Sequence, residues 1–271
     1  MFKLLLKILG VLVLVLLVGA VVLFLFAPNR FNVLVIGSDQ RGTERARSDV
    51  MFIFSLAKWP SDRTSLITIP RDSRVDIPGH GIDKLTHAYA YGEVEEGSVL
   101  GNKDLTTVSI ENVLDIQIDG TIEVTFDSFV SIVDALGGVD HSTEGHLDGE
   151  AALAQVRDRY RPGGDFARTS DQRELFRALL TKVRSGGNPQ MLYRLSQEDP
   201  QIRVDIPEQK FLWFGYGFFI AHGGKLSLGE VYDEALPGKG ETLFAPAFGQ
   251  NLYFWVLDEQ KTAELVEMHL R

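Results

Sequence analysis

The sequence contains no cysteine, which excludes disulfide bonds and metal sites built on thiolates. This absence suits an oxidising exterior without proving that location. Positive charge is also scarce, because 27 Lys and Arg stand against 37 Asp and Glu, for a formal net charge of −10 at pH 7. A nucleic-acid-binding protein needs a broad basic face to neutralise phosphates, so the composition argues against that class. Any anionic ligand must therefore meet a local cluster of basic residues.

Internal repeats and low-complexity linkers are absent as well, so the 271 residues favour one soluble domain over several. One long hydrophobic run is present, at residues 8–27, ILGVLVLVLLVGAVVLFLFA, and it carries no charge. At about 1.5 Å of rise per residue a helix of this length spans a bilayer, and we predict a transmembrane helix here. The alternative is a cleaved signal peptide with the small residues VGA at 18–20, but further uncharged residues follow that point.

Two lysines set the predicted orientation of this helix. Lys3 and Lys7 precede the apolar run, and the positive-inside rule then holds residues 1–7 in the cytoplasm. Residues 28–271 would follow as an extracytoplasmic domain. The sequence therefore predicts a single-pass protein of the cell membrane, with its C-terminal domain outside.

The domain is predicted to be of the α/β class, with helices flanking a central mixed, largely antiparallel sheet in an α-β-α arrangement. Three β-branched and aromatic runs, FNVLVIGS, VMFIFSLA and TSLITIP, are typical of buried strands. Their connections are too short for parallel crossovers, which favours an antiparallel meander. In that topology Asp39, Asp49 and Arg71 lie at one edge of the sheet.

Several segments downstream show the patterns of helices. GNKDLTTVSIENVLD, LDGEAALAQVRDR, TSDQRELFRALLTKVRSG and FLWFGYGFFI are predicted helices, and a terminal helix is predicted from about Asp258. GTIEVTFD alternates as a strand, and Asp127 or Ser128 is the expected N-cap of the helix that follows it. The pair Gly137 and Gly138 is expected to end that helix.

The segment GSDQRGTERARSD between the first two strands holds the first candidate site. Asp39 and Asp49, brought together by a hairpin, are a candidate Mg²⁺ site, because Mg²⁺ takes oxygen ligands and often relies on two carboxylates plus substrate phosphates. The alternative is that Asp39 caps a turn and Asp49 only flanks a strand.

The second candidate site is the segment IPRDSR, which follows directly on a predicted strand. Arg71 and Arg74 are candidates to fork onto phosphate oxygens, since a guanidinium is planar and stays charged. A solvated pair of arginine and aspartate on the surface is the alternative.

The segment VRDRYRPGGDFAR is the third candidate. Arg157, Arg159 and Arg161 alternate, and only an extended chain puts such residues on one side, so the preceding helix is expected to end near Val156. These arginines form a candidate anion site in an otherwise acidic protein.

Beyond this arginine segment, Arg168 and Gln172 are four residues apart and share one face of the next helix near its N-terminus, where anions are favoured. An ordinary exposed helix face remains the alternative reading for both side chains.

The segment DKLTHAYAYG is the fourth candidate. Lys84 and His87 are possible phosphate contacts, or His87 a proton carrier, while Tyr89 and Tyr91 suit stacking on a sugar. A histidine beside aromatic residues is more often a packing residue. The other histidines show no metal-ligand spacing, which argues against zinc; they are His80, His141, His146, His222 and His269.

Seven segments resemble, in order, successive blocks of the LytR-CpsA-Psr family. They cover roughly residues 31–185, and a later segment, GKGETLFAPAFGQNLYFWVLD, is similar to the tail of that family. The segments are NVLVIGSDQR, ARSDVMFIFSL, SLITIPRDSRV, DKLTHAYAYG, FDSFVSIVDALGGVD, LDGEAALAQVRDRY and GDFARTSDQR.

The resemblance implies a Mg²⁺-dependent phosphotransferase outside the membrane. It would transfer a glycopolymer from a polyprenyl-pyrophosphate carrier to peptidoglycan or a similar cell-wall acceptor. Asp39 and Asp49 match the magnesium-associated aspartates, and the arginines that grip the pyrophosphate match Arg71, Arg157 and Arg159. Further head-group contacts match Lys84, Arg168 and Gln172, with Arg47 and Arg74 as additional candidates.

One departure from the family pattern lies between Val139 and Leu147, where DHSTEGH replaces a longer hairpin. The shorter hairpin bears on acceptor or lipid specificity. Two other functions remain open at this stage: a lipid-pyrophosphate hydrolase, in which water takes the place of the acceptor, and a membrane-tethered binding or regulatory module without turnover.

Overall fold

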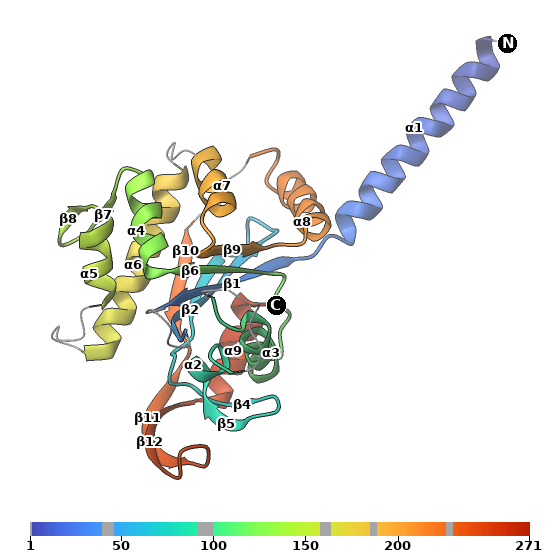
Figure 1. Cartoon of the computed structure of the whole chain (residues 1–271). Helices are drawn as coiled ribbons and strands as arrows, with labels where there is room; N and C mark the ends of the chain where they lie inside the picture. The colour runs from blue at the N-terminus through green and yellow to red at the C-terminus, as the bar shows by residue number, and fades with distance from the viewer. Residues whose placement is uncertain (1, 40–45, 92–99, 158–163, 185–188, 226–229) are drawn as a thin grey trace.

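The structure is a computed structural model that describes residues 2–39, 46–91, 100–157, 164–184, 189–225 and 230–271. Within these ranges the side chains of residues 2–6, 8, 164–170, 184 and 189 lie outside the description. Figure 1 shows a layered domain from which the N-terminal helix projects.

A six-stranded sheet with the order β10-β3-β2-β1-β6-β9 forms the middle layer. Strands β1, β2 and β3 are antiparallel neighbours, which confirms the predicted meander. Strand β6 pairs parallel with β1 and antiparallel with β9, and β10 pairs parallel with β3, so the sheet is mixed. The strands are β1 (Arg30–Ser38), β2 (Ser48–Ala57), β3 (Thr64–Thr68), β6 (Gly120–Thr125), β9 (Ile202–Asp205) and β10 (Val231–Ala235).

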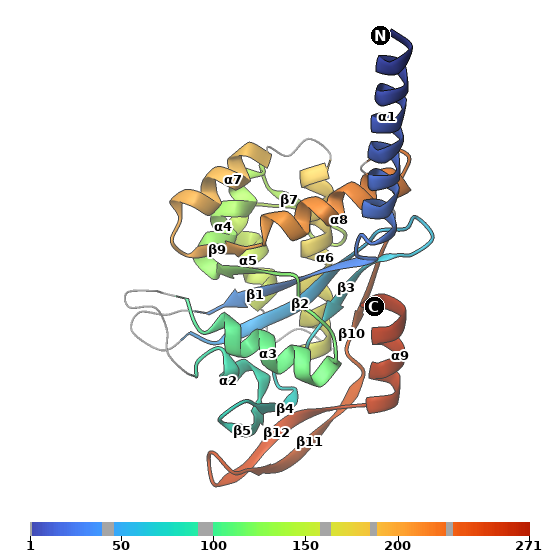
Figure 2. The same cartoon turned by 90° about the vertical axis from the view of Figure 1, so that its right-hand side faces the viewer.

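Helices cover both faces of this sheet, as Figures 1 and 2 show from two directions. One face carries α2 (Leu85–Ala88), α3 (Lys103–Leu114) and α9 (Glu259–His269). The other carries α4 (Phe126–Ala135), α5 (Gly149–Arg157), α6 (Gly164–Arg184), α7 (Pro189–Glu198) and α8 (Glu208–Ala221). The predicted arrangement of helices on both sides of a mixed sheet is therefore confirmed.

Strand β1 is apolar at most of its central positions because both of its faces are covered. Leu34 and Ile36 pack into the core that α3 and α9 complete, while Phe31 and Val33 pack against aromatic side chains of α8. Successive strand residues point to opposite faces, so a strand covered on both sides needs apolar residues at nearly every position.

Three small hairpins stand apart from the main sheet. The β4–β5 hairpin follows β3, the β7–β8 hairpin joins α4 to α5, and the β11–β12 hairpin precedes the terminal helix. Their strands are β4 (Arg74–Ile77), β5 (Gly81–Lys84), β7 (Val139–His141), β8 (Gly145–Leu147), β11 (Gly238–Ala245) and β12 (Gln250–Leu257).

The ends of α4 correct one prediction and confirm another. The N-cap is Thr125, whose side chain accepts a hydrogen bond from the Ser128 amide, so the expected cap at Asp127 or Ser128 is wrong. The strand β6 runs directly into the helix, which moves the cap to the last strand residue. Gly137 and Gly138 follow the helix with positive φ values of 74° and 80°, as a helix end with glycines requires.

Helix α1 (Phe2–Leu25) has 24 residues and leads into β1. Its leucine and valine side chains from Leu9 onward are 45–64% exposed. The last turns contact α8, because Trp213 and Tyr216 donate hydrogen bonds to the carbonyls of Leu23 and Ala20. Among the described residues, no helix combines the length and hydropathy that crossing a membrane requires.

Candidate functional site

The candidate site forms where three strands end at one edge of the sheet. Strand β1 ends at Ser38, β2 begins at Ser48, and β3 ends shortly before Arg71. The Asp39 amide donates to the Arg47 carbonyl at 3.2 Å, which carries the β1–β2 pairing one step past the strands. The antiparallel order thus brings Asp39, Asp49 and Arg71 to the same edge, as the sequence predicted.

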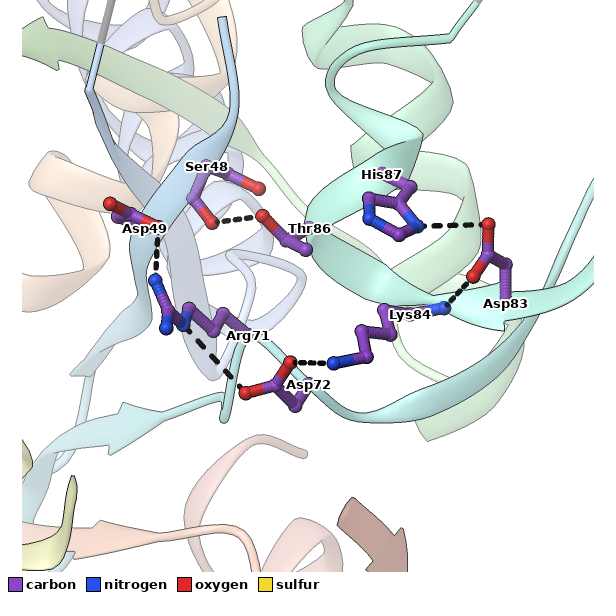
Figure 3. A network of polar contacts seen from close by, with 8 residues as sticks. All are labelled: Ser48, Asp49, Arg71, Asp72, Asp83, Lys84, Thr86 and His87. Atoms are coloured by element: carbon purple, nitrogen blue, oxygen red, sulfur yellow. Dashed lines mark hydrogen bonds and ion pairs between the residues drawn. The ribbon is translucent and has the colours of Figure 1, made fainter. Parts of the chain in front are cut away.

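A chain of charged contacts runs along this edge, and Figure 3 shows it from close by. Arg71 Nη1 donates to Asp49 Oδ1 at 2.5 Å, and Arg71 Nε lies 3.7 Å from Asp72 Oδ2. Lys84 Nζ donates to Asp72 Oδ1 at 2.7 Å. The structure therefore brings together three predicted site residues, Asp49, Arg71 and Lys84, and adds Asp72, which sequence reasoning had not singled out.

Backbone contacts from α2 hold this network in place. Thr86 Oγ1 donates to the Ser48 carbonyl at 2.8 Å, and the Thr86 amide donates to the Arg71 carbonyl at 2.9 Å. These bonds tie the start of β2, the segment after β3 and α2 to one another. The backbone segments that carry the charged side chains are thus held together by hydrogen bonds, which limits the reorganisation needed when a ligand binds.

Arg74 joins the same cluster from the β4–β5 hairpin. It is the direct cross-strand partner of Lys84, so the two cationic side chains share a face. Arg74 Nε is buried and has no hydrogen-bond partner among the described residues.

His87 belongs to an ordered group next to the network. Its Nδ1 lies 2.9 Å from Asp83 Oδ2, and the Tyr91 hydroxyl donates to the same carboxylate at 2.5 Å. Burial, and then the bond to Asp83, raises the pKa of Tyr91 to about 12. The His87 ring also packs near Phe248. The ring is therefore held in place as a packing residue would be, while a role as proton carrier stays a prediction.

The two tyrosines predicted to stack on a sugar, Tyr89 and Tyr91, differ in burial. Tyr89 is fully buried, with its hydroxyl donating to Glu123, so the prediction of sugar stacking is wrong for Tyr89. Gly101 leaves room for the ring, because a Cβ at that position would lie 2.5 Å from Tyr89 Cδ1, and no local pattern reveals this contact. Tyr91 is partly exposed and stacks on His80 at 4.5 Å between ring centroids.

The arginine segment between α5 and α6 lies partly beyond the description. Helix α5 extends to Arg157, one residue past the expected end at Val156, and the Arg157 guanidinium lies 5.6 Å from the centre of the Phe126 ring. Arg159 and Arg161 are outside the described residues, and for Arg168 only the backbone in α6 is described. The roles of these arginines in anion binding stay predictions.

Gln172 and Arg47 differ sharply in exposure. Gln172 is 9% exposed, and its amide donates to the Val156 carbonyl at 3.4 Å, which links α6 to α5. Arg47 is exposed beside the start of β2. Head-group binding by either residue stays a prediction.

Comparison with known proteins identifies similar chains. The sequence model of the LytR_cpsA_psr family matches residues 26–145 and 140–267. A Bacillus anthracis protein named polyisoprenyl-teichoic acid–peptidoglycan teichoic acid transferase TagU is 35% identical over 167 residues, or 56% of this chain and 52% of the relative. That match spans about half the length of the relative. A Bacillus licheniformis protein of the same name is 30% identical over 257 residues, covering 88% of this chain and 77% of the relative.

Solved structures share the fold. A structure described as TagT bound to LIIa-WTA superposes with a TM-score of 0.65 at 28% identity, covering 89% of both chains. The Lin1025 protein from Listeria innocua superposes with a TM-score of 0.67 at 23% identity, covering 89% of this chain and 97% of that one, and this likeness concerns the fold alone.

Proposed function

The chain belongs to the LytR-CpsA-Psr family, and on this premise we propose that it is a phosphotransferase of the cell wall. It takes a glycopolymer from a polyprenyl-pyrophosphate carrier and joins it to a hydroxyl of peptidoglycan or a similar wall polymer through a phosphodiester. The names of the two Bacillus relatives, which are teichoic acid transferases acting on peptidoglycan, support this proposal.

The observation that carries the proposal is the charged network at the sheet edge. Its side chains are neither buried nor fully solvated, since Arg71 is 22% exposed and Asp49 15% exposed. Partial burial strengthens the attraction between a guanidinium and a phosphate, yet it leaves the site open to a ligand. Arg74, on the same hairpin as Lys84, brings the cations at this edge to three, with Arg71, and these suit a pyrophosphate.

In the proposed reaction the acceptor hydroxyl oxygen attacks the phosphorus that carries the sugar. A new phosphorus–oxygen bond forms, the bond from that phosphorus to the bridging oxygen breaks, and polyprenyl phosphate leaves with the electron pair. The hydroxyl proton passes to a carboxylate at the same edge, for which Asp39 and Asp49 are the candidates. Arg71 and Lys84 offset the charge on the phosphate oxygens during the step.

Mg²⁺ fits the donor set at this edge. Asp49 uses Oδ1 for Arg71, and an ionised carboxylate has a second oxygen that can accept a cation. We propose that Asp39 and Asp49 hold Mg²⁺ together with the phosphates of the substrate, and that the ion supplies charge neutralisation there. Replacement of Asp39 or Asp49 by asparagine tests their role as general base. If the variants still bind the metal and retain full turnover, neither aspartate is the base.

The remaining predicted residues extend the proposed anion site along the substrate. Arg157 and Arg159 grip the pyrophosphate with Arg71, while Lys84, Arg168 and Gln172 contact the head group. Arg47 and Arg74 add charge on the side of the hairpin. For Arg159 and Arg168 this proposal rests on the sequence alone, as their side chains lie outside the described residues.

We further propose that α1 is a membrane anchor with the domain outside. The uncharged run at 8–27 and the exposed apolar side chains of α1 support the anchor. The lysines before this run support the orientation. Apolar side chains of α8 next to α1 are exposed too, among them Leu212 at 60%. Protease added to intact cells should digest the domain and spare a tag placed before residue 1; a protected domain would overturn the orientation.

A transfer assay tests the activity. The full chain in detergent is given a labelled glycan on polyprenyl pyrophosphate and peptidoglycan fragments, with Mg²⁺ or with chelator. We expect label in the fragments, dependent on metal and lost in Arg71→Ala. Arg271→Ala is the matched control, since Arg271 pairs with Asp115 and Glu267 at the C-terminus of the chain. Release of free glycan phosphate would favour a hydrolase, and bound but unconsumed lipid would favour a binding module.

A further inference from the structure

A second cluster of potential ligands lies away from the charged network, between the β7–β8 hairpin and α6. His141, Asp171 and Glu174 each offer one ligand atom, and these three atoms lie within 4.8 Å of one another. His141 is the last residue of β7, and the two carboxylates are three residues apart on α6, which puts them on one helix face. The histidine on β7 and the carboxylates on α6 are too far apart in sequence for a spacing motif to reveal the group.

The His141 ring supplies an independent sign that a ligand is missing. Its side chain is 1% exposed, and its Nε2 is buried with no hydrogen-bond partner among the described residues. That nitrogen is directed at Glu174, with Oε2 3.6 Å away, too far for a hydrogen bond. Several buried polar atoms of the described residues lack a hydrogen-bond partner, and this nitrogen differs from the others in lying within a group of possible metal ligands.

Neighbouring groups hold these side chains in place. The Ser142 amide donates to Glu174 Oε1 at 2.6 Å, the Thr143 amide donates to His141 Nδ1 at 3.4 Å, and Thr143 Oγ1 lies 3.2 Å from the same nitrogen. Nδ1 therefore accepts in this structure, and the proton of the neutral ring is on Nε2. Metal binding at Nε2 requires that proton to move to Nδ1, where Thr143 Oγ1 can accept it.

We propose that His141, Asp171 and Glu174 bind a divalent transition-metal ion of the Zn²⁺ type, with water completing the shell. One imidazole and two carboxylates suit Zn²⁺, whereas Mg²⁺ prefers oxygen ligands alone. Histidine spacing in the sequence does not reveal this group, because its ligands come from β7 and α6. This site is separate from the proposed Mg²⁺ site, and its ion pins the β7–β8 hairpin to α6, the helix that carries Arg168 and Gln172.

Metal binding to the purified full chain tests the proposal without reference to activity. After chelation and dialysis, Zn²⁺ is titrated by calorimetry, and thermal unfolding is followed with and without the ion. We expect one saturable zinc site and a higher Tm with zinc. His141→Gln and Glu174→Gln should each weaken the affinity at least tenfold, since each variant removes one of three protein ligands. The matched control, Asp39→Asn with Asp49→Asn, should keep the zinc site.

Three results would overturn the proposal. The first is the absence of saturable zinc binding by the wild type. The second is binding by both single variants as tight as that of the wild type, and the third is loss of the site in the aspartate control. Because a variant of the buried His141 can misfold, Co²⁺ is bound to the wild type as a second measurement. Strong visible absorption bands of tetrahedral cobalt support the site, and their absence leaves only an ion pair between His141 and Glu174.

Discussion

Two of the networks of arginine and carboxylate in this molecule differ in their place, one at the edge of the sheet and one that reaches into it. At the edge, Asp49, Arg71, Asp72 and Lys84 are all between 15% and 22% exposed. Inside, Glu123 of β6 is 0% exposed and accepts a hydrogen bond from the Tyr89 hydroxyl at 2.8 Å.

The interior network is closed by Arg203 of β9, whose Nε lies 2.8 Å from Glu123 Oε2. Burial raises the pKa of Glu123 to about 7, although the charge of Arg203 and the bond from Tyr89 oppose this rise. Burial also raises the pKa of Tyr89. Arg203 is 26% exposed, but Glu123 and Tyr89 are enclosed, so this carboxylate stabilises the fold and has no access to a substrate.

The comparison teaches that residue type does not separate a site from a structural ion pair, whereas access to solvent does. A charge at the edge can exchange a protein partner for a phosphate, because water and ligand both reach it. A buried charge cannot make that exchange without a large desolvation cost. Changes at the edge should therefore alter turnover, and changes inside should alter stability.

The largest effect is expected from Arg71→Ala. Loss of the guanidinium should lower the transfer rate at least about a hundredfold, the cost typical of removing one preorganised donor from a reacting oxyanion. The Tm should stay close to that of the wild type, because the side chain is partly exposed. Initial rates with labelled lipid and a thermal melt measure both quantities. Full turnover would remove the distinction between the two networks.

Tyr89→Phe should affect stability instead. It leaves the buried Glu123 without the donor at 2.8 Å, which should lower the free energy of unfolding by about 1–3 kcal/mol. Transfer per folded molecule should not change. Denaturant titration measures the loss, with the exposed Tyr193→Phe as control, since Tyr193 is 68% exposed. Equal stability of the two variants would contradict the structural role.

Lys84→Met should have a smaller effect on turnover than Arg71→Ala. It removes one charge-assisted contact while keeping the length of the side chain, so we expect roughly a tenfold lower transfer rate. Asp72 then loses its partner at 2.7 Å. Rates at varied lipid concentration show whether KM or kcat changes. A variant as inactive as Arg71→Ala would mean that the two cations act as one unit.

Glu123→Gln should change how stability depends on pH. The pKa of Glu123 is raised from 4.5 to about 7, so this group stabilises the folded state fully below pH 4.5 and loses that contribution as pH rises to about 7. The glutamine variant does not titrate, so its free energy of unfolding relative to the wild type should rise between pH 4.5 and about 7. Unfolding curves at several pH values measure the difference. A constant difference would place the pKa of Glu123 near its ordinary value.

The sequence by itself determined the main strands and helices, because each is set by local periodicity and by short connections. It also determined that Asp49 and Arg71 meet, since an antiparallel meander brings those strand ends to one edge. The C-terminal helix is another case, since it was predicted from about Asp258 and begins at Glu259.

Only the tertiary structure decided which polar residues are buried and which distant segments meet. Tyr89 and Tyr91 are two residues apart, yet one is enclosed and the other partly exposed. His141 reaches Asp171 and Glu174 only because the β7–β8 hairpin packs on α6. Burial and long-range contact depend on the packing of whole elements, which a local pattern of residues does not encode.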